Sequence, residues 1–343
     1  MTEPYDALLV VSFGGPEGMN DVIPFLQNVL KGKNVPMQRM KEVAKHYELF
    51  DGVSPINQQN RQLIAGLKAE FLKHNLNLPI YWGNRNWHPM LPDTLRLMSE
   101  NRIKRCLAFV TSAYNSYSGC RQYLQDIDSA RMDVENAPKI EKIRAFFNHP
   151  GFIETMVLQV NAAIDKLNAP DRSKVAFAFT GHSIPIEMAK TCQYEQQLME
   201  ACRLVMEQIG PNPWNLVYQS RSGPPEQQWL EPDICKHLWD LKSSSIEYVV
   251  IVPIGFISDH MEVKYDLDTE AKQIATQLGL KMERAATVGS HPRFLRMVYE
   301  LVMERIAGTP KLALGDMAPS PDVCAIDCCN YQPKAFGASW QKR

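Results

Sequence analysis

Residues 175–185 read Val-Ala-Phe-Ala-Phe-Thr-Gly-His-Ser-Ile-Pro, and this stretch decides the class of fold. Its first six residues form a nearly continuous apolar run that ends in turn residues, which is typical of a strand buried on both faces of a parallel sheet. Similar runs recur along the chain. We expect strands at 7–13, 79–83, 105–111, 175–180, 216–219 and 248–253.

Amphipathic stretches with helical spacing separate these strands. The first has Val22, Phe25, Leu26 and Val29 on one face. The expected helices cover 18–30, 58–72, 153–167, 194–209, 266–278 and 292–306. Alternating strands and helices imply right-handed crossovers, so the sequence predicts a doubly wound α/β fold with helices flanking parallel sheets.

The chain has 343 residues, about twice the usual size of one domain. A polar, proline-containing break at 167–173 precedes a fresh strand, so we expect an N-terminal lobe over 1–160 and a C-terminal lobe over 161–308. Residues 309–343 show no periodic pattern and are expected to form an irregular tail. No sequence repeat relates the two halves.

The composition is that of an ordinary globular protein, with 45% hydrophobic and 22% charged residues. A formal net charge of −1 argues against a protein that captures nucleic acid electrostatically. The acidic N-terminus and the lack of an apolar run of roughly 18–20 residues predict neither a signal peptide nor an integral membrane segment. We expect a cytoplasmic protein whose eight cysteines are free or hold a metal.

The first strand ends in a glycine-rich turn, Ser-Phe-Gly-Gly-Pro-Glu-Gly over 12–18. Such a turn before a helix can bind phosphate. The G-x-G-x-x-G spacing is absent, however, and Pro16 removes a backbone donor, which argues against nucleotide binding. Because ligands collect at the carboxyl ends of strands in open α/β sheets, the turn is expected to line a pocket.

His182 follows the strand at 175–180, at the sheet edge where active sites of this architecture form. A neutral imidazole there can accept a proton near pH 7 or bind a metal such as Fe²⁺. The alternative is a histidine that only satisfies the turn made by Gly181 and Pro185.

The stretch 253–270 is dense in residues that bind metals or protons. If it is helical, its carboxylates fall into one column beside His260, because spacings of three and four residues share a helix face. The column consists of Asp259, Glu262, Asp266 and Glu270. A solvated acidic face is the alternative, but such faces normally include lysine or arginine, and Lys264 and Lys272 fall on other faces. We therefore predict a column that holds a cation or relays protons.

These motifs carry a family resemblance. Gly-His-Ser-Ile-Pro at 181–185, Ile-Ser-Asp-His-Met-Glu at 257–262 and Tyr-Asp-Leu-Asp at 265–268 resemble ferrochelatases, which insert Fe²⁺ into a porphyrin. Supporting stretches are found at 8–17, 52–56, 83–87, 218–223 and 229–230. The resemblance, which runs from about residue 6 to 306, implies two Rossmann-like lobes with a porphyrin cleft between them.

The resemblance also implies roles for individual residues. His182 and Glu262 would flank the metal and act in catalysis, with Asp259, His260 and Asp266 as the proton or metal path. Four further residues would contact the porphyrin: Phe13, Ser54, Tyr123 and Trp229. Phe13 stands where other members have Tyr or Met, so no axial phenolate ligand is expected from that face.

Cys120 and the tail cysteines Cys324, Cys328 and Cys329 resemble the ligands of family members that carry a [2Fe–2S] cluster. The adjacent Cys328–Cys329 pair departs from the commoner spacing, and a tail with incidental thiols is the alternative. The other four cysteines are expected to be core residues. Because metal insertion transfers no electrons, the cluster would have a structural role, pinning the tail to the first lobe.

Two stretches, Ser-Gly-Cys-Arg-Gln-Tyr at 118–123 and Gly-Asn-Arg-Asn-Trp at 83–87, resemble bacterial members that metallate coproporphyrin III. Arg85 and Arg121 are candidates for contacts with its additional propionates. Protoporphyrin IX is the alternative substrate. A chelatase that inserts Co²⁺, or a carrier that binds haem without catalysis, would be the other readings; iron donors and haem acceptors are not predicted.

Overall fold

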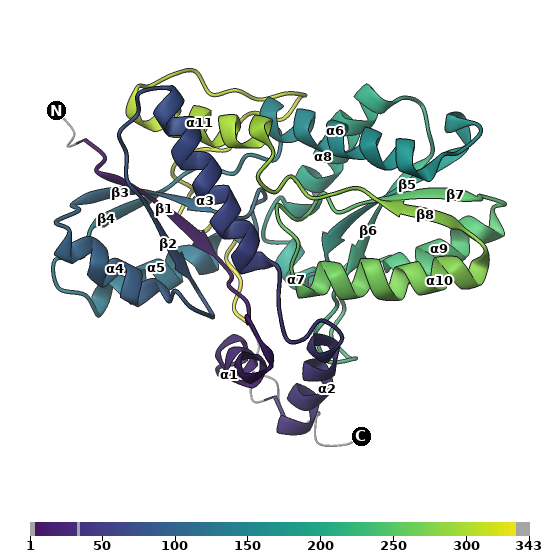
Figure 1. The fold of residues 1–343 in the computed structure, drawn as a ribbon, viewed down its shortest axis with the longest axis horizontal. Helices are drawn as coiled ribbons and strands as arrows, with labels where there is room; N and C mark the ends of the chain where they lie inside the picture. The colour runs from purple at the N-terminus through teal and green to yellow at the C-terminus, as the bar shows by residue number, and fades with distance from the viewer. Residues whose placement is uncertain (1–3, 33–34, 334–343) are drawn as a thin grey trace.

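The computed structural model describes residues 4–32 and 35–333 and contains two parallel β-sheets flanked by helices (Figure 1). The first sheet comprises β1 (Ala7–Ser12), β2 (Ile80–Asn84), β3 (Arg105–Val110) and β4 (Lys139–Lys142), in the order β2-β1-β3-β4. The second comprises β5 (Val175–His182), β6 (Trp214–Gln219), β7 (Tyr248–Val252) and β8 (Lys281–Arg284), in the order β6-β5-β7-β8. The predicted α/β class with two parallel sheets is confirmed.

The two sheets have the same strand order, a symmetry that the sequence does not reveal. β1 and β5 are the central first strands, and their carboxyl ends carry Phe13 and His182 respectively. The edge strands β4 and β8 were not expected, because Lys-Ile-Glu-Lys and Lys-Met-Glu-Arg are short and largely polar. Each edge strand pairs with its neighbour through main-chain hydrogen bonds that need no apolar run.

Helices cover both faces of each sheet. The first lobe contains α1 (Met19–Val29), α2 (Met37–Glu48), α3 (Ile56–Lys73), α4 (Leu91–Glu100), the π-helix η1 (Tyr117–Arg121) and α5 (Gln122–Met132). Later elements are α6 (Pro150–Leu167), the 3₁₀ turn η2 (Arg172–Lys174), α7 (Ile186–Ala189), α8 (Tyr194–Ile209), α9 (Ile234–Ser243), the π-helix η3 (Val263–Ala271), α10 (Lys272–Leu278) and α11 (Pro292–Ile306). All six expected helices are present, while α2, α4, α5 and α9 were not anticipated.

A single hydrophobic core joins the lobes. Leu8 and Val10 of β1 belong to the same buried cluster as Phe177 and Phe179 of β5. α6 and α11 connect the two sides: α6 packs on the second sheet, whereas α11 returns to lie against α3 over the first (Figure 1). The expected lobe boundary at residue 160 falls within α6, and the chain crosses back to the first lobe at α11.

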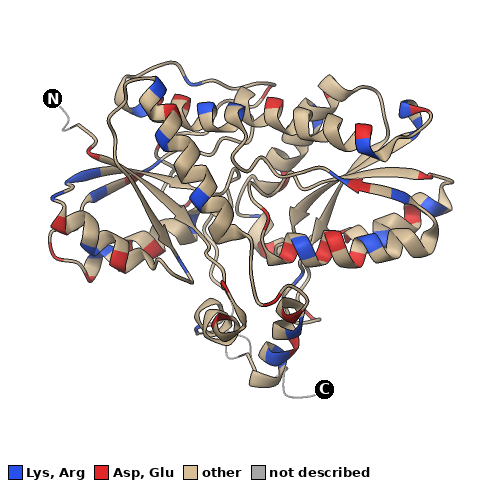
Figure 2. Ribbon diagram, in the orientation of Figure 1, with Lys and Arg blue, Asp and Glu red and all other residues tan. Residues whose placement is uncertain are grey.

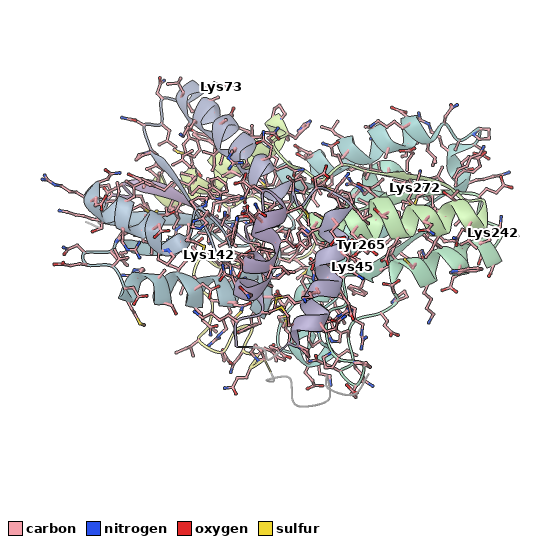
Figure 3. The ribbon with its side chains drawn as sticks, turned by 60° about the horizontal axis from the view of Figure 1, so that its bottom comes forward. Lys45, Lys73, Lys142, Lys242, Tyr265 and Lys272 are labelled. Atoms are coloured by element: carbon pink, nitrogen blue, oxygen red, sulfur yellow. The ribbon has the colours of Figure 1, made fainter. Side chains whose placement is uncertain are left out.

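The helices α1 and α2 extend from the edge between the lobes (Figure 1). Phe25 and Tyr47 of these helices are buried against Met261, which belongs to the second lobe. His46 stacks on Tyr265, with ring centroids 3.8 Å apart, and Figure 3 shows Lys45 of α2 beside Tyr265. The α1–α2 pair therefore lies directly against the acidic π-helix η3.

The described part of the tail, 309–333, contains no helix or strand, and specific hydrogen bonds hold it. Leu314 donates its N–H to the carbonyl of Asn148 at 2.8 Å. Arg121 donates to the carbonyls of Ile326 and Cys328, both at 2.8 Å. Within 4–32 and 35–333, no helix is both long enough and apolar enough to cross a membrane.

A buried ion pair fastens α11 to the first lobe. The guanidinium of Arg144 donates two hydrogen bonds to Glu304, at 2.7 and 2.8 Å, and a third to the carbonyl of Leu312 in the tail. The two side chains are 0% and 3% exposed. Removing one partner of such a pair leaves an uncompensated buried charge.

We predict that Glu304→Gln lowers the free energy of unfolding by about 3 kcal/mol or more. The exposed pair Arg39–Glu42, with side chains 49% and 46% exposed, provides the control, and Glu42→Gln should change it by less than about 0.5 kcal/mol. Urea denaturation of both variants measures the difference. Equal losses in the two variants would contradict this account of the junction.

Candidate active site

His182 is the last residue of β5, and two glycines bring its surroundings together. Gly255 follows β7, the neighbour of β5, and its N–H donates to the carbonyl of Thr180 at 3.0 Å. A Cβ atom at Gly255 would lie 2.7 Å from Cα of Gly181, closer than real contacts allow. Only glycine at this position lets the loop that leads to Glu262 approach His182.

The loop after β7 is also tied to the first lobe. Tyr114 donates its hydroxyl to the carbonyl of Ile254 at 2.9 Å, and Gln59 of α3 accepts from the N–H of Asp259 at 2.8 Å. Both contacts cross between the lobes. The position of Glu262 therefore depends on the first lobe as well as on its own sheet.

The imidazole of His182 has a defined orientation. Its Nδ1 lies 2.5 Å from the carbonyl oxygen of Ser183, and because a carbonyl only accepts, Nδ1 carries the hydrogen. Nε2 is then the basic atom, and it lies 3.5 Å from Oε2 of Glu262. The side chains of His182 and Glu262 are 32% and 49% exposed, so both reach solvent. The structure thus brings together the two predicted catalytic residues.

The charge of Glu262 dominates the protonation of His182. Burial lowers the pKa of His182, but the carboxylate of Glu262, its hydrogen bond with the ring, the carbonyl of Ser183 and the charge of Asp266 together raise it above the ordinary value. The histidine is therefore poised to accept a proton near neutral pH.

Asp266, one turn further along η3, is a second proton-holding group. Burial raises its pKa, and the charges of Glu262 and Glu270 add to this, against the hydrogen bond from Ser220 and the charge of His182, with a net pKa of about 7. Ser220 donates its hydroxyl to Asp266, and Gln219 donates its amide to the same carboxylate at 3.4 Å. Asp266 can therefore take up and release a proton at physiological pH.

Ser220 and Gln219 were not singled out from the sequence as functional residues. Ser220 adopts a left-handed backbone conformation with φ 63°, which is uncommon for a residue other than glycine. This conformation follows the end of β6 and places the hydroxyl on Asp266. No one-dimensional pattern signals such a backbone angle at a serine.

Three of the four carboxylates in the expected column interact. Glu262 and Glu270 both raise the pKa of Asp266, and acidic residues follow one another along η3 and α10 in Figure 2. Asp259 is not brought to this group: its carboxylate pairs with Arg284 at 3.0 Å and accepts from Thr287 at 3.2 Å. Sequence spacing missed this pair because Arg284 lies in β8, a strand that was not expected.

His260 has a capping geometry. Its Nδ1 accepts the backbone N–H groups of Glu262 at 3.1 Å and Val263 at 3.4 Å, at the start of the helical segment. Burial lowers its pKa, as does the charge of His182, although Glu262 and Asp259 act in the opposite sense. The ring is thus neutral at pH 7 and orients the backbone of Glu262, so capping, which was the alternative for His182, is found at His260.

The four residues expected to contact porphyrin have different surroundings. Phe13 is 37% exposed and lies edge-on to Phe25. Tyr123 is only 6% exposed, beneath the guanidinium of Arg85, which lies 4.5 Å from its ring centroid and 5.8 Å from that of Phe13. Arg85 is in turn paired with Asp126.

Ser54 and Trp229 lie beside the two turns that follow β1 and β5. Ser54 is 3% exposed and packs so closely on Gly15 that a Cβ there would lie 2.7 Å from Cβ of Ser54. Trp229 is half-buried and forms a β-bridge with Pro185, three residues after His182. Of the four, Phe13 and Trp229 have appreciable exposure.

The four cysteines expected as cluster ligands line a single hollow of about 690 Å³ between the first lobe and the tail. The thiols of Cys120 and Cys324 are hydrogen-bonded, which raises the pKa of Cys120 and lowers that of Cys324. Sγ of Cys328 lies 3.5 Å from Sγ of Cys329. A fifth thiol, Cys192 of the second lobe, is close enough to raise the pKa of Cys329 by its charge; it was expected to be a plain core residue.

The described residues contain no group of three His, Cys, Asp or Glu side chains arranged to hold a single metal ion. The cysteines instead form two pairs. His182 and Glu262 form a pair of potential ligands with open solvent beside them.

We predict that Glu262→Gln lowers the pKa of His182, because the carboxylate that stabilises the imidazolium is removed. An NMR titration of the imidazole resonances should show the midpoint moving to lower pH. Glu270→Gln is the matched control, since Glu270 acts on Asp266 rather than on His182, and it should leave the midpoint unchanged. An unchanged or higher midpoint in Glu262→Gln would refute the electrostatic assignment.

Comparisons with known proteins agree with this geometry. The ferrochelatase family model matches residues 5–306. A ferrochelatase from Rhodopirellula baltica is 55% identical over 335 residues, covering 96% of this chain and 95% of that protein. A coproporphyrin III ferrochelatase from Streptomyces coelicolor is 48% identical, covering 98% and 96%.

Among solved structures, SirB from Bacillus subtilis with Fe³⁺ has the same fold, with a TM-score of 0.56 at 13% identity, covering 89% of this chain and 96% of that one. The predicted family resemblance is confirmed over nearly the whole of the chain's two lobes. The chain belongs to the ferrochelatase family.

Proposed function

We propose that this protein inserts Fe²⁺ into coproporphyrin III. The observation that carries the proposal is the placement of Nε2 of His182 3.5 Å from Glu262, beside Asp266, whose pKa is about 7. Several relatives that are 42–48% identical to this chain are named coproporphyrin III ferrochelatases. A cytoplasmic location stays a prediction.

The reaction exchanges two pyrrole protons of the porphyrin for one Fe²⁺ ion. His182 accepts a pyrrole proton at Nε2, because Nδ1 already carries a hydrogen directed at Ser183. The resulting imidazolium is stabilised by Glu262, and Asp266 can receive the proton next, since its pKa lies near neutrality. Each proton thus moves along one chain of groups to solvent.

The same pair suits the incoming metal. Imidazole and carboxylate are both ligands of Fe²⁺, and two ligands hold the ion weakly enough for transfer to four pyrrole nitrogens. Phe13, at the matching strand end of the first sheet, has no ligating atom. The proposed entry of metal therefore uses the His182 side of the ring.

The choice of coproporphyrin III rests on the relatives and on one arginine. Arg121 is committed to two tail carbonyls, which weakens its case as a ligand of substrate propionates. Arg85 remains the better candidate, held between Asp126 and the rings of Phe13 and Tyr123. A guanidinium in this position can bind a carboxylate without first losing much side-chain entropy.

We predict that steady-state metallation has a higher kcat/KM for coproporphyrin III than for protoporphyrin IX, because the four propionates of the former can use more polar contacts. Anaerobic assays with Fe²⁺ and each porphyrin measure both values. Arg85→Met should narrow the ratio. A wild-type preference for protoporphyrin IX would overturn the substrate assignment.

We also propose that Cys120, Cys324, Cys328 and Cys329 hold a [2Fe–2S] cluster. Support comes from the hollow that all four line and from their arrangement as two pairs, since each iron of such a cluster takes two thiolates. When bound, the cluster supplies a covalent link between the first lobe and the tail. It takes no part in the metal exchange, which involves no electron transfer.

We predict that the protein isolated under anaerobic conditions has the visible absorbance of a [2Fe–2S] cluster and that Cys324→Ser loses it. Cys235→Ser is the matched control, because Cys235 lies in α9 of the second lobe and does not line the hollow. Cys192→Ser also retains the absorbance if Cys329 is the fourth ligand. Wild-type protein without this absorbance or bound iron and sulfide would contradict the proposal.

A further inference from the structure

Five cationic side chains line the hollow that contains the four cysteines: Arg105, Arg121, Lys139, Lys142 and Arg305. Three of these charges are already matched, because Arg105, Lys139 and Arg305 share the carboxylate of Glu141 at 3.0, 2.9 and 2.7 Å. Arg121 directs its guanidinium at two carbonyls of the tail. Lys142 is the exception.

Lys142 is the last residue of β4 and lies on the first-lobe side of the molecule (Figure 3). Its Nζ donates to the carbonyl of Ile143 at 2.9 Å and is also hydrogen-bonded to the thiol of Cys120. Its charge reaches Cys324 as well. In the part of the chain that the structure describes, Lys142 forms no ion pair with a carboxylate.

The backbone holds this contact in place. Lys142 pairs with Ala108 of β3, and the next residue, Ile143, donates its N–H to the carbonyl of Ala108 at 2.9 Å. Cys120 lies in η1, at the start of the helix that follows β3. The ammonium and the sulfur are therefore presented by two adjoining parts of one sheet rather than by the tail.

We propose that Lys142 is the charge partner of the thiolate cluster, donating a hydrogen bond to the Cys120 sulfur and raising the reduction potential of the iron–sulfur centre. This inference rests on the cluster proposed above. Four thiolates outweigh the positive charge of the oxidised core, and one-electron reduction makes the assembly more negative still. A fixed ammonium stabilises the more negative state more strongly and so makes reduction easier.

Lys142→Met tests this role. An anaerobic redox titration, followed by visible absorbance and by electron paramagnetic resonance of the reduced cluster, should give a midpoint more negative than that of the wild type. Lys142→Arg should restore it, because the charge and a donor are retained. Lys139→Met is the matched control: it removes the same charge from the same strand and hollow, but a charge that Glu141 already neutralises, so it should leave the midpoint unchanged.

Each outcome is decisive. Loss of the cluster in Lys142→Met, with retention in Lys142→Arg and Lys139→Met, supports the same charge requirement. An intact cluster whose midpoint equals that of the wild type, or shifts equally in Lys139→Met, overturns the role of Lys142 and leaves the cluster proposal standing. Wild-type protein that contains no cluster overturns both proposals.

Discussion

The contact between the backbones of Gly181 and Gly255 is the constraint on which the candidate active site depends. β5 and β7 are neighbouring parallel strands, so their carboxyl ends meet at one edge of the sheet. The absence of side chains at both glycines lets the two following segments touch. His182 from one strand end and Glu262 from the other loop thereby come within 3.5 Å. Tyr114 and Gln59 of the first lobe hold the same loop, which links the chemistry to the packing of both lobes.

The two lobes repeat one plan and use it for different purposes. In each, the third strand is followed by a π-helix that continues into an α-helix: η1 and α5 in the first, η3 and α10 in the second. π-Helical turns are rare and are frequent at functional sites. In the second lobe this element carries Asp266, and in the first it carries Cys120. The proposed catalytic and cluster centres therefore occupy equivalent places in a duplicated architecture.

Much of this could be predicted from the sequence, because long apolar strands and amphipathic helices have strong periodic patterns. His182 and Glu262 were also accessible, since strand ends in an α/β fold define where ligands collect. The pairing of Asp259 with Arg284 was not, because it depends on β8, a short polar edge strand. The capping role of His260 and the tail contacts of Arg121 likewise depend on three-dimensional contacts that spacing does not encode.

The central claim is that His182 accepts the pyrrole protons, and His182→Ala tests it most directly. Porphyrin binding is followed by fluorescence quenching, and insertion by the change in the porphyrin spectrum after anaerobic addition of Fe²⁺ in a single turnover. The account predicts that the dissociation constant stays within a few-fold of the wild type while insertion slows by about 10²-fold or more, the usual contribution of a positioned base. Insertion at the wild-type rate in the variant would contradict it.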